Sequence, residues 1–232
     1  MLTPTPLRLE TLSPHHYQSL AIPSGVATYA AVMADRAVSY GLASTFGALI
    51  ASPALPTKGY ARDFASMTWL ASAFVARDPS LMRPMGRRLT LEHEGGFQRS
   101  VQDATGTGNL KQWFFIQEVP AGKIYDGAVF GPDPFEIASR AASAPVEEIV
   151  IRVGRHRSGL VRLTRGGVRE VRLNLHSAFV SGADIDAIED MRVDIPALWD
   201  MQISNPIPLD RAGELLGSWQ ESARFQQKIA AA

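Results

Sequence analysis

The sequence contains no cysteine, which excludes disulfide scaffolds, thiolate catalysis, zinc ribbons and iron–sulfur clusters. Lysine is scarce as well: only four of the 23 basic residues are lysine, and the other 19 are arginine. The arginine guanidinium binds phosphate in a fork and stacks on bases, whereas the lysine ammonium acts mainly as a point charge. The arginine bias therefore fits recognition of anions, although a GC-rich genome produces the same bias.

A net charge is also absent, because 23 acidic residues balance the 23 basic ones. The 46% apolar and 20% charged residues are globular proportions that exclude general disorder, and 232 residues predict one domain with elaborations. Met1–Pro6 lacks the basic and apolar regions of a secretory signal, and the most apolar stretch, Val26–Ala51, is interrupted by Asp35 and Arg36. We expect a soluble, cytoplasmic protein with no membrane contact.

The motifs of common cofactor and metal sites are missing. Gly122-Lys123 has neither the upstream glycine nor the following Ser or Thr of a phosphate loop, and no Gly-x-Ser-x-Gly elbow occurs. His15 and His16 are adjacent and point apart, so they do not form a metal-binding pair. We expect no cofactor and no metal.

Hydrophobic periodicity predicts both strands and helices. Leu7–Leu12 alternates apolar and polar residues as a half-buried strand does, while the apolar residues from Val26 to Ser44 recur at helical steps. Asp63–Ala76 is a candidate second helix, and Gly166-Gly167 is expected to close a hairpin onto Val168–Leu175. Further strands are predicted at residues 113–116, 124–130, 149–153 and 160–163, with helices at 133–142 and 209–232.

Residues 83–111 are rich in arginine and glycine and predict an exposed hairpin. Leu89–His93 alternates like one strand, and Phe97–Val101 returns from a turn at Gly95-Gly96. The hairpin is either a phosphate clamp or an ordinary charged hairpin. Its candidate RNA-binding residues are Arg87, Arg88, Arg99 and Lys111.

Charges are sorted along the second half of the chain. Seven arginines and one acid lie between residues 151 and 172, and six acids and one arginine lie between residues 184 and 200. The turn at Gly154–Gly159 lets backbone amides approach a phosphate, and Arg155 and Arg157 can make forked contacts. His156 can stack on a splayed base, although the strand arginines also fit a solvated sheet face. The candidate RNA-binding residues here are Gly154, Arg155, His156, Arg157 and Ser158, joined by His15 and His16 of the first loop.

Three stretches follow one another in a recognisable order. They are the strand with its Ser-Pro break at Leu7–His15, the run EVPAGKIYDGAV at Glu118–Val129, and the run IRVGRHRSGLVRL at Ile151–Leu163. Together they resemble the RAMP superfamily of CRISPR-associated RNA-binding proteins. The helix with Tyr29 and Tyr40-Gly-Leu is most similar to the Cas-five branch in its subtype I-D form, with the type IV relative as a close alternative.

The resemblance implies an α+β fold, with a ferredoxin-like (RRM-like) antiparallel sheet, helices on one face and a projecting hairpin, the thumb. Residues 1–232 would form one such domain, with residues 83–111 as the candidate thumb. The implied role is non-catalytic: one copy per surveillance (Cascade) complex in antiviral defence, gripping the 5′ handle of the guide RNA (crRNA) and capping the backbone. The implied partners are that RNA, the backbone and large subunits, and target DNA indirectly.

Two other functions stay open. Some RAMP relatives cut repeat RNA without a metal, and the candidates for that chemistry are His15, His16, Tyr17 and Lys111. A protein-docking subunit with little RNA contact is the second alternative. Its basic and acidic faces would bind neighbouring subunits, with Ala43–Leu55 as a possible contact surface.

Overall fold

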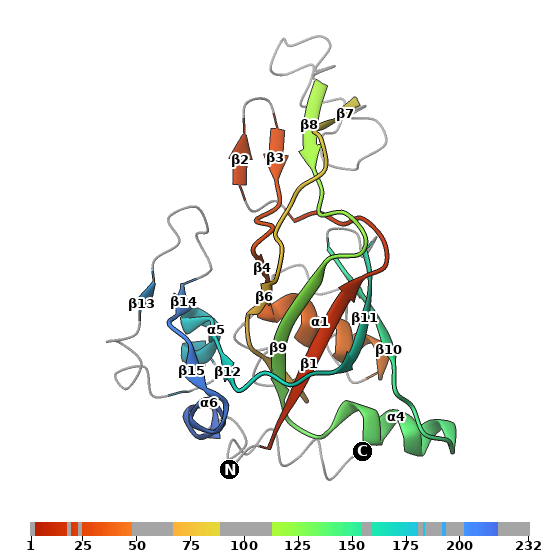
Figure 1. The fold of residues 1–232 in the computed structure, drawn as a ribbon, viewed down its shortest axis with the longest axis vertical. Helices are drawn as coiled ribbons and strands as arrows, with labels where there is room; N and C mark the ends of the chain where they lie inside the picture. Colours follow the sequence, from red (N-terminus) through yellow and green to blue (C-terminus); the bar gives the residue numbers. More distant parts are fainter. Residues whose placement is uncertain are drawn as a thin grey trace, which may run out of the picture.

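The computed structural model describes residues 3–17, 20–22, 25–47, 67–88, 113–154, 159–180, 183, 192–193 and 202–217. These residues form a mixed structure of mostly antiparallel, curled sheet with a few helices, which confirms the predicted α+β class (Figure 1). The helices are α1 (Asp35–Thr45), α4 (Pro134–Ala142), α5 (Leu175–Val180) and α6 (Leu209–Leu215).

One curled sheet organises the molecule. Its strand order is β10-β11-β1-β9-β6-β4, and β5 pairs with β9 beside this path. All these pairings are antiparallel. The strands are β1 (Pro4–Thr11), β4 (Val32–Met33), β5 (Leu70–Ala71), β6 (Phe74–Ala76), β9 (Ile124–Phe130), β10 (Ile149–Val153) and β11 (Gly159–Arg165).

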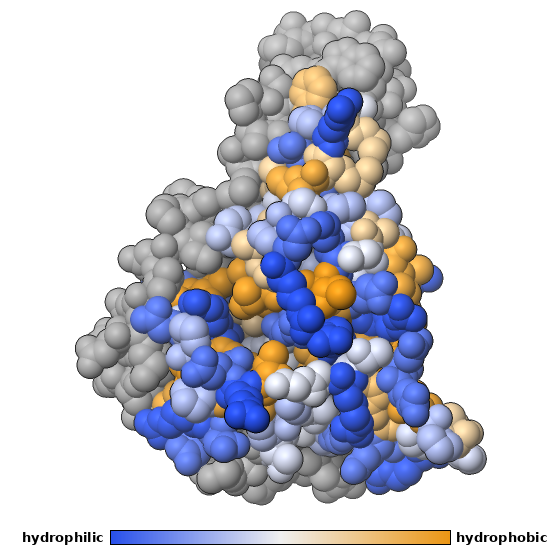
Figure 2. All heavy atoms as spheres, viewed as in Figure 1, coloured by the Kyte–Doolittle hydropathy of each residue, from blue (hydrophilic) through white to orange (hydrophobic). Residues whose placement is uncertain are grey.

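The two faces of this sheet follow the alternation in the sequence. In β1, Leu7 and Leu9 are fully buried while Arg8 between them is exposed. The buried face packs against α1, which lies behind β1 and β9 in Figure 1 and contributes Val38 and Leu42 to the same core cluster. The front of the sheet is mostly hydrophilic in Figure 2, as expected for an antiparallel sheet with one solvated face.

Three smaller sheets surround the main one. A four-stranded sheet of order β2-β3-β8-β7 extends above the body in Figure 1. The pairs β12-β15 and β13-β14 lie near α5 and α6, to the left of the main sheet in Figure 1. Their strands are β2 (Leu20–Ile22), β3 (Gly25–Ala27), β7 (Met85–Arg88), β8 (Trp113–Gln117), β12 (Glu170–Val171), β13 (Arg192–Val193), β14 (Ile203–Ser204) and β15 (Ile207–Pro208).

One helix prediction was wrong in part, and a second was wrong over all of its described residues. The helix expected from Val26 begins only at Asp35, because residues 25–27 pair in parallel with β8 and residues 32–33 pair with β6. The described part of the second expected helix, residues 67–76, contains strands β5 and β6 on either side of Ser72. A short apolar run has no periodicity that separates a buried strand from a buried helix, so strand pairing decided both cases.

The hairpin predicted at Gly166-Gly167 was also wrong. Glu170 and Val171 form β12, which pairs with β15 rather than returning along β11. By contrast, the strands predicted at 124–130 and 149–153 and the helix after Asp133 are present, with Pro134 at the first turn of α4. The terminal helix is described over Leu209–Leu215, and most of its predicted length lies outside the described residues.

Candidate nucleic-acid interface

The His-His-Tyr segment that follows β1 is held in place by backbone hydrogen bonds. The N–H of His15 donates to the carbonyl of Val119 at 3.2 Å, and the N–H of Val119 donates back to His15 at 2.9 Å. Two residues on, the N–H of Tyr17 donates to the hydroxyl of Thr28 at 2.9 Å. The segment is therefore attached to two other parts of the chain and has a defined position at the end of the sheet.

The two glycines of the predicted turn rest directly on this segment. Gly154 has a φ of +83°, and a Cβ there would lie 3.3 Å from Cβ of His15. At Gly159 a Cβ would lie only 2.5 Å from the same atom, closer than real side chains approach. The N–H of Gly154 also donates to the hydroxyl of Tyr17 at 3.2 Å. Two regions about 140 residues apart, which the sequence singled out separately, thus form one unit.

The burial of both histidines differs from the prediction that they contact RNA. His15 is 1% exposed and His16 is 5% exposed. Burial, together with the neighbouring His16, lowers the pKa of His15 to about 4. Nδ1 of His16 lies 3.4 Å from a carboxylate oxygen of Glu118. The physical reason for the difference is that Cβ of His15 lies against both Gly154 and Gly159, and the backbone of His16 lies against Gly154, so both histidines are enclosed instead of facing solvent.

The side chain of Tyr17 is also fixed by contacts within the protein. Burial raises the pKa of its hydroxyl, which accepts the hydrogen bond from Gly154, and its ring meets that of His15 edge-on with centroids 5.5 Å apart. A phenol with a raised pKa stays protonated at neutral pH. Tyr17 is therefore a neutral side chain with a fixed position beside Gly154.

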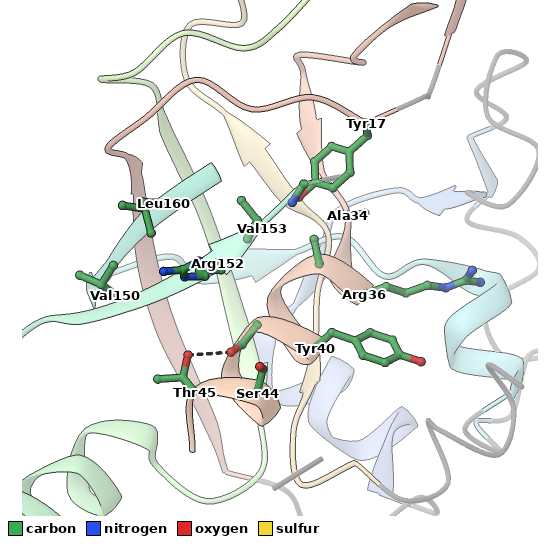
Figure 3. Close-up of a pocket in the computed structure, with 13 residues that line it drawn as sticks. Tyr17, Ala34, Arg36, Tyr40, Ser44, Thr45, Val150, Arg152, Val153 and Leu160 are labelled. Atoms are coloured by element: carbon green, nitrogen blue, oxygen red, sulfur yellow. Dashed lines mark hydrogen bonds between the residues drawn. The ribbon is translucent and has the colours of Figure 1, made fainter. Parts of the chain in front are cut away.

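A groove opens beside the turn, between α1 and the edge strand β10 (Figure 3). Its volume is about 790 Å³. Gly41 lets helix and strand approach closely, because a Cβ there would lie 2.9 Å from Cδ1 of Ile151. The groove is lined by Tyr17, Ala34, Arg36, Ala37, Tyr40, Gly41, Ser44, Thr45, Val150, Arg152, Val153, Gly154 and Leu160.

Most arginines on or next to the strands of the main sheet have a partner. On the front of the sheet, Arg162 pairs with Glu10 at 2.6 Å and with Glu148 at 3.3 Å. Arg8 and Arg77 share the carboxylate of Asp126 in the same way. These three thus fit the alternative of a solvated, charge-paired face. Arg172 donates to the carbonyl of Ser204 at 3.0 Å.

Arg152 differs from these. It is exposed at the edge of the sheet, and within the described part of the chain it has no ion-pair partner. Sequence reasoning placed Arg152 with the strand arginines and did not single it out. Its neighbours in the groove, Tyr40 and Ser44, come from a helix more than 100 residues away, and nothing in the local sequence marks them as a site.

Most of the other predicted site residues lie outside the described residues. Arg87 and Arg88 belong to β7 and stand opposite Phe114 and Trp113 of β8. In the part that the structure describes, no group of three or more His, Asp or Glu side chains is arranged to hold a metal ion. The site residues outside the described ranges are Arg99, Lys111, Arg155, His156, Arg157 and Ser158, as is nearly all of the acidic stretch 184–200.

Comparison with known proteins gives no family assignment: no family model matches this chain, and no curated protein matches it at a significant level. None of the helices described is both long enough and apolar enough to cross a bilayer.

Proposed function

We propose that this chain is a non-catalytic RNA-binding subunit of a type I CRISPR surveillance complex, which grips the 5′ handle of the guide RNA and caps the backbone. The observation that carries the proposal is the packing of Gly154 and Gly159 against His15, together with the hydrogen bond from Gly154 to Tyr17. Backbone amides of a glycine turn, with arginines beside them, are groups that bind a phosphate.

The strand order of the main sheet supports the resemblance to the RAMP superfamily on which the proposal draws. Strands β11-β1-β9-β6 are antiparallel neighbours, with α1 following β1 and α4 following β9. This order is the one expected of a ferredoxin-like β-α-β-β-α-β unit. The edge strand β10 is an addition, and it carries the turn in question.

The pairing of β7 with β8 supports the proposed thumb. Residues 85–88 run antiparallel to residues 113–116, so Arg88 and Trp113, the described residues on either side of the arginine- and glycine-rich segment, are paired. The sheet that contains this pair extends away from the body in Figure 1. Such a position suits contact with an RNA end and an adjacent subunit.

The test is binding of the full chain to single-stranded RNA with a repeat-derived 5′ end, measured over a range of salt concentrations. Removing one arginine–phosphate contact to a single strand flattens the logarithmic salt slope by about 0.7. The double change Arg155→Ala, Arg157→Ala should therefore weaken binding and flatten the slope by about 1.4.

The matched control is Arg169→Ala, Arg211→Ala, which removes two exposed arginines away from the turn and should leave the slope unchanged. Absence of RNA binding by the unmodified chain would reject the proposal. Equal slopes for both double variants would reject this turn as the site.

The nuclease alternative is not favoured by the described residues, because His15 and His16 are buried under the turn. Incubation with repeat RNA in EDTA separates the two functions: the proposal expects intact RNA, and site-specific cleavage would support the endoribonuclease. The docking alternative has no specific support, since most of Ala43–Leu55 lies outside the described residues.

A further inference from the structure

The groove between α1 and β10 has a size and charge that suit one nucleotide. At about 790 Å³ it falls within the range of small-ligand sites, about 300–1,000 Å³. The described residues that line it include two arginines, Arg36 and Arg152, and no acid. An arginine side chain at a concave site attracts an anion.

The two arginines have different positions in the groove. Nε of Arg36 donates to the hydroxyl of Ser177 at 3.4 Å, and in Figure 3 its side chain extends away from β10 toward α5. Arg152 lies on the opposite wall, exposed and without an acidic partner among the described residues. Arg152 is therefore the cation that an incoming phosphate meets.

The remaining walls provide a ring and hydroxyl groups. The ring of Tyr17 borders one end of the groove, and its hydroxyl accepts a hydrogen bond from the N–H of Gly154. The backbone N–H of Tyr17 donates to the hydroxyl of Thr28. Ser44 and Thr45 lie at the other end, and the hydroxyl of Thr45 donates to the carbonyl of Gly41 at 2.8 Å. Unpaired bases commonly stack on aromatic side chains and form hydrogen bonds with neighbouring polar groups.

The groove is continuous with the proposed interface, because Tyr17 and Gly154 belong to both. An RNA strand bound beside Gly154 would therefore enter the groove at its Tyr17 end. The geometry points to a specific site: the groove between α1 and β10 holds one unpaired nucleotide of the bound RNA, with its phosphate on Arg152 and its base beside Tyr17. This inference rests on the proposed function and names the position at which the RNA is read.

The experiment combines two groove variants with an abasic scan of the RNA. Arg152→Ala removes the phosphate contact, and Ser44→Trp fills the groove from an exposed helical position. The controls are Arg169→Ala, an exposed arginine elsewhere, and Ala141→Trp, an exposed position on α4. RNAs that lack one base at each position in turn are bound to every protein, and thermal unfolding confirms that each variant is folded.

For the unmodified chain, we expect one abasic position to weaken binding about tenfold, the usual effect of removing one stacked base. Arg152→Ala and Ser44→Trp should each weaken binding of intact RNA by about the same factor, while the controls bind normally. In Ser44→Trp the abasic position should no longer matter, because base and groove act as one contact.

Three results would overturn the inference in distinguishable ways. Normal RNA binding with a flat abasic scan and unaffected groove variants rejects the groove while leaving the proposed function in place. No RNA binding by the unmodified chain rejects both. Saturable binding of AMP or UMP by a chain that ignores RNA assigns the groove to a free nucleotide.

Discussion

At positions 154 and 159 the absence of a side chain is required for two different reasons. Gly154 adopts a left-handed backbone conformation that side chains disfavour, whereas Gly159 is crowded, with His15 where a Cβ would stand. The crowding at Gly159 originates in His15. The close packing at this end of β11 therefore depends on a residue from the start of the chain.

Gly159→Ala should destabilise the protein by about 1–3 kcal/mol, the usual cost of forcing an extra carbon into a packed interior. The matched control is Gly167→Ala, because nothing lies within 4 Å of the Cβ position there. Urea unfolding of both variants measures the effect, and a control as unstable as Gly159→Ala would contradict this explanation.

His15 should make the protein less stable in mild acid. Its pKa is about 4 in the folded chain against an ordinary value of 6.5, so between these pH values the unfolded chain binds a proton that the folded chain does not. Stability therefore falls as the pH decreases from about 6.5 to about 4, by at most about 3.4 kcal/mol at 1.36 kcal/mol per pKa unit.

The measurement is the free energy of unfolding as a function of pH for the unmodified chain, His15→Gln and His176→Gln. The His15 variant should show a shallower decrease, whereas exposed His176 provides the matched control. The same decrease in all three proteins would assign the acid sensitivity to other groups.

Among the elements, α4 shows most directly how local sequence sets a boundary. Asp133 accepts a hydrogen bond from the N–H of Phe135 at 2.9 Å, and Pro134 occupies the first turn where no amide partner is needed. The second carboxylate oxygen of Asp133 pairs with Arg165 at 2.7 Å. Arg165 in turn lies 4.8 Å from the ring centre of Phe135.

Two substitutions separate the cap from the ion pair. Asp133→Ala should cost about 1–2 kcal/mol because the helix loses its cap, while Asp133→Asn keeps a capping oxygen. The Asn variant should cost well under 1 kcal/mol, because the Arg165 side chain is 58% exposed and such ion pairs contribute little. Thermal unfolding measures both, and equal losses would assign the stability to the charge.

At the scale of the whole molecule, a buried polar contact links α1 to the C-terminal flank. Asp35, in the first turn of α1, is 1% exposed and accepts a hydrogen bond from Nδ2 of Asn174 at 2.8 Å. Burial raises the pKa of this carboxyl, while hydrogen bonds from Ser177 and Asn174 oppose the change. The contact lies where α5 meets the helix that packs on the main sheet.

Asn174→Ala should destabilise the chain by about 2–3 kcal/mol, because a buried acceptor loses its donor. Asn205→Ala, at an exposed position, should stay within about 0.5 kcal/mol of the unmodified chain. Adding Asp35→Asn should reduce the cost of Asn174→Ala, because an amide needs less compensation than a carboxylate. Additive effects in a double-mutant cycle would show that the two side chains act independently.

Local patterns in the sequence were sufficient for part of this structure. The alternation in Leu7–Thr11 and Ile149–Val153 and the start of the helix beside Pro134 each depend on residues within a few positions of one another. These features follow from backbone geometry and solvent exposure, which neighbouring residues determine.

Only the tertiary structure decided the rest. Residues 25–27 and 70–76 became strands because β8 and β9 offered hydrogen-bonding edges, against a helical or ambiguous pattern. The seating of Gly159 on His15, the burial of both histidines and the groove that contains Arg152 likewise join residues more than 100 positions apart. Such contacts leave no periodic trace in the sequence, because they depend on which surfaces meet after the chain has folded.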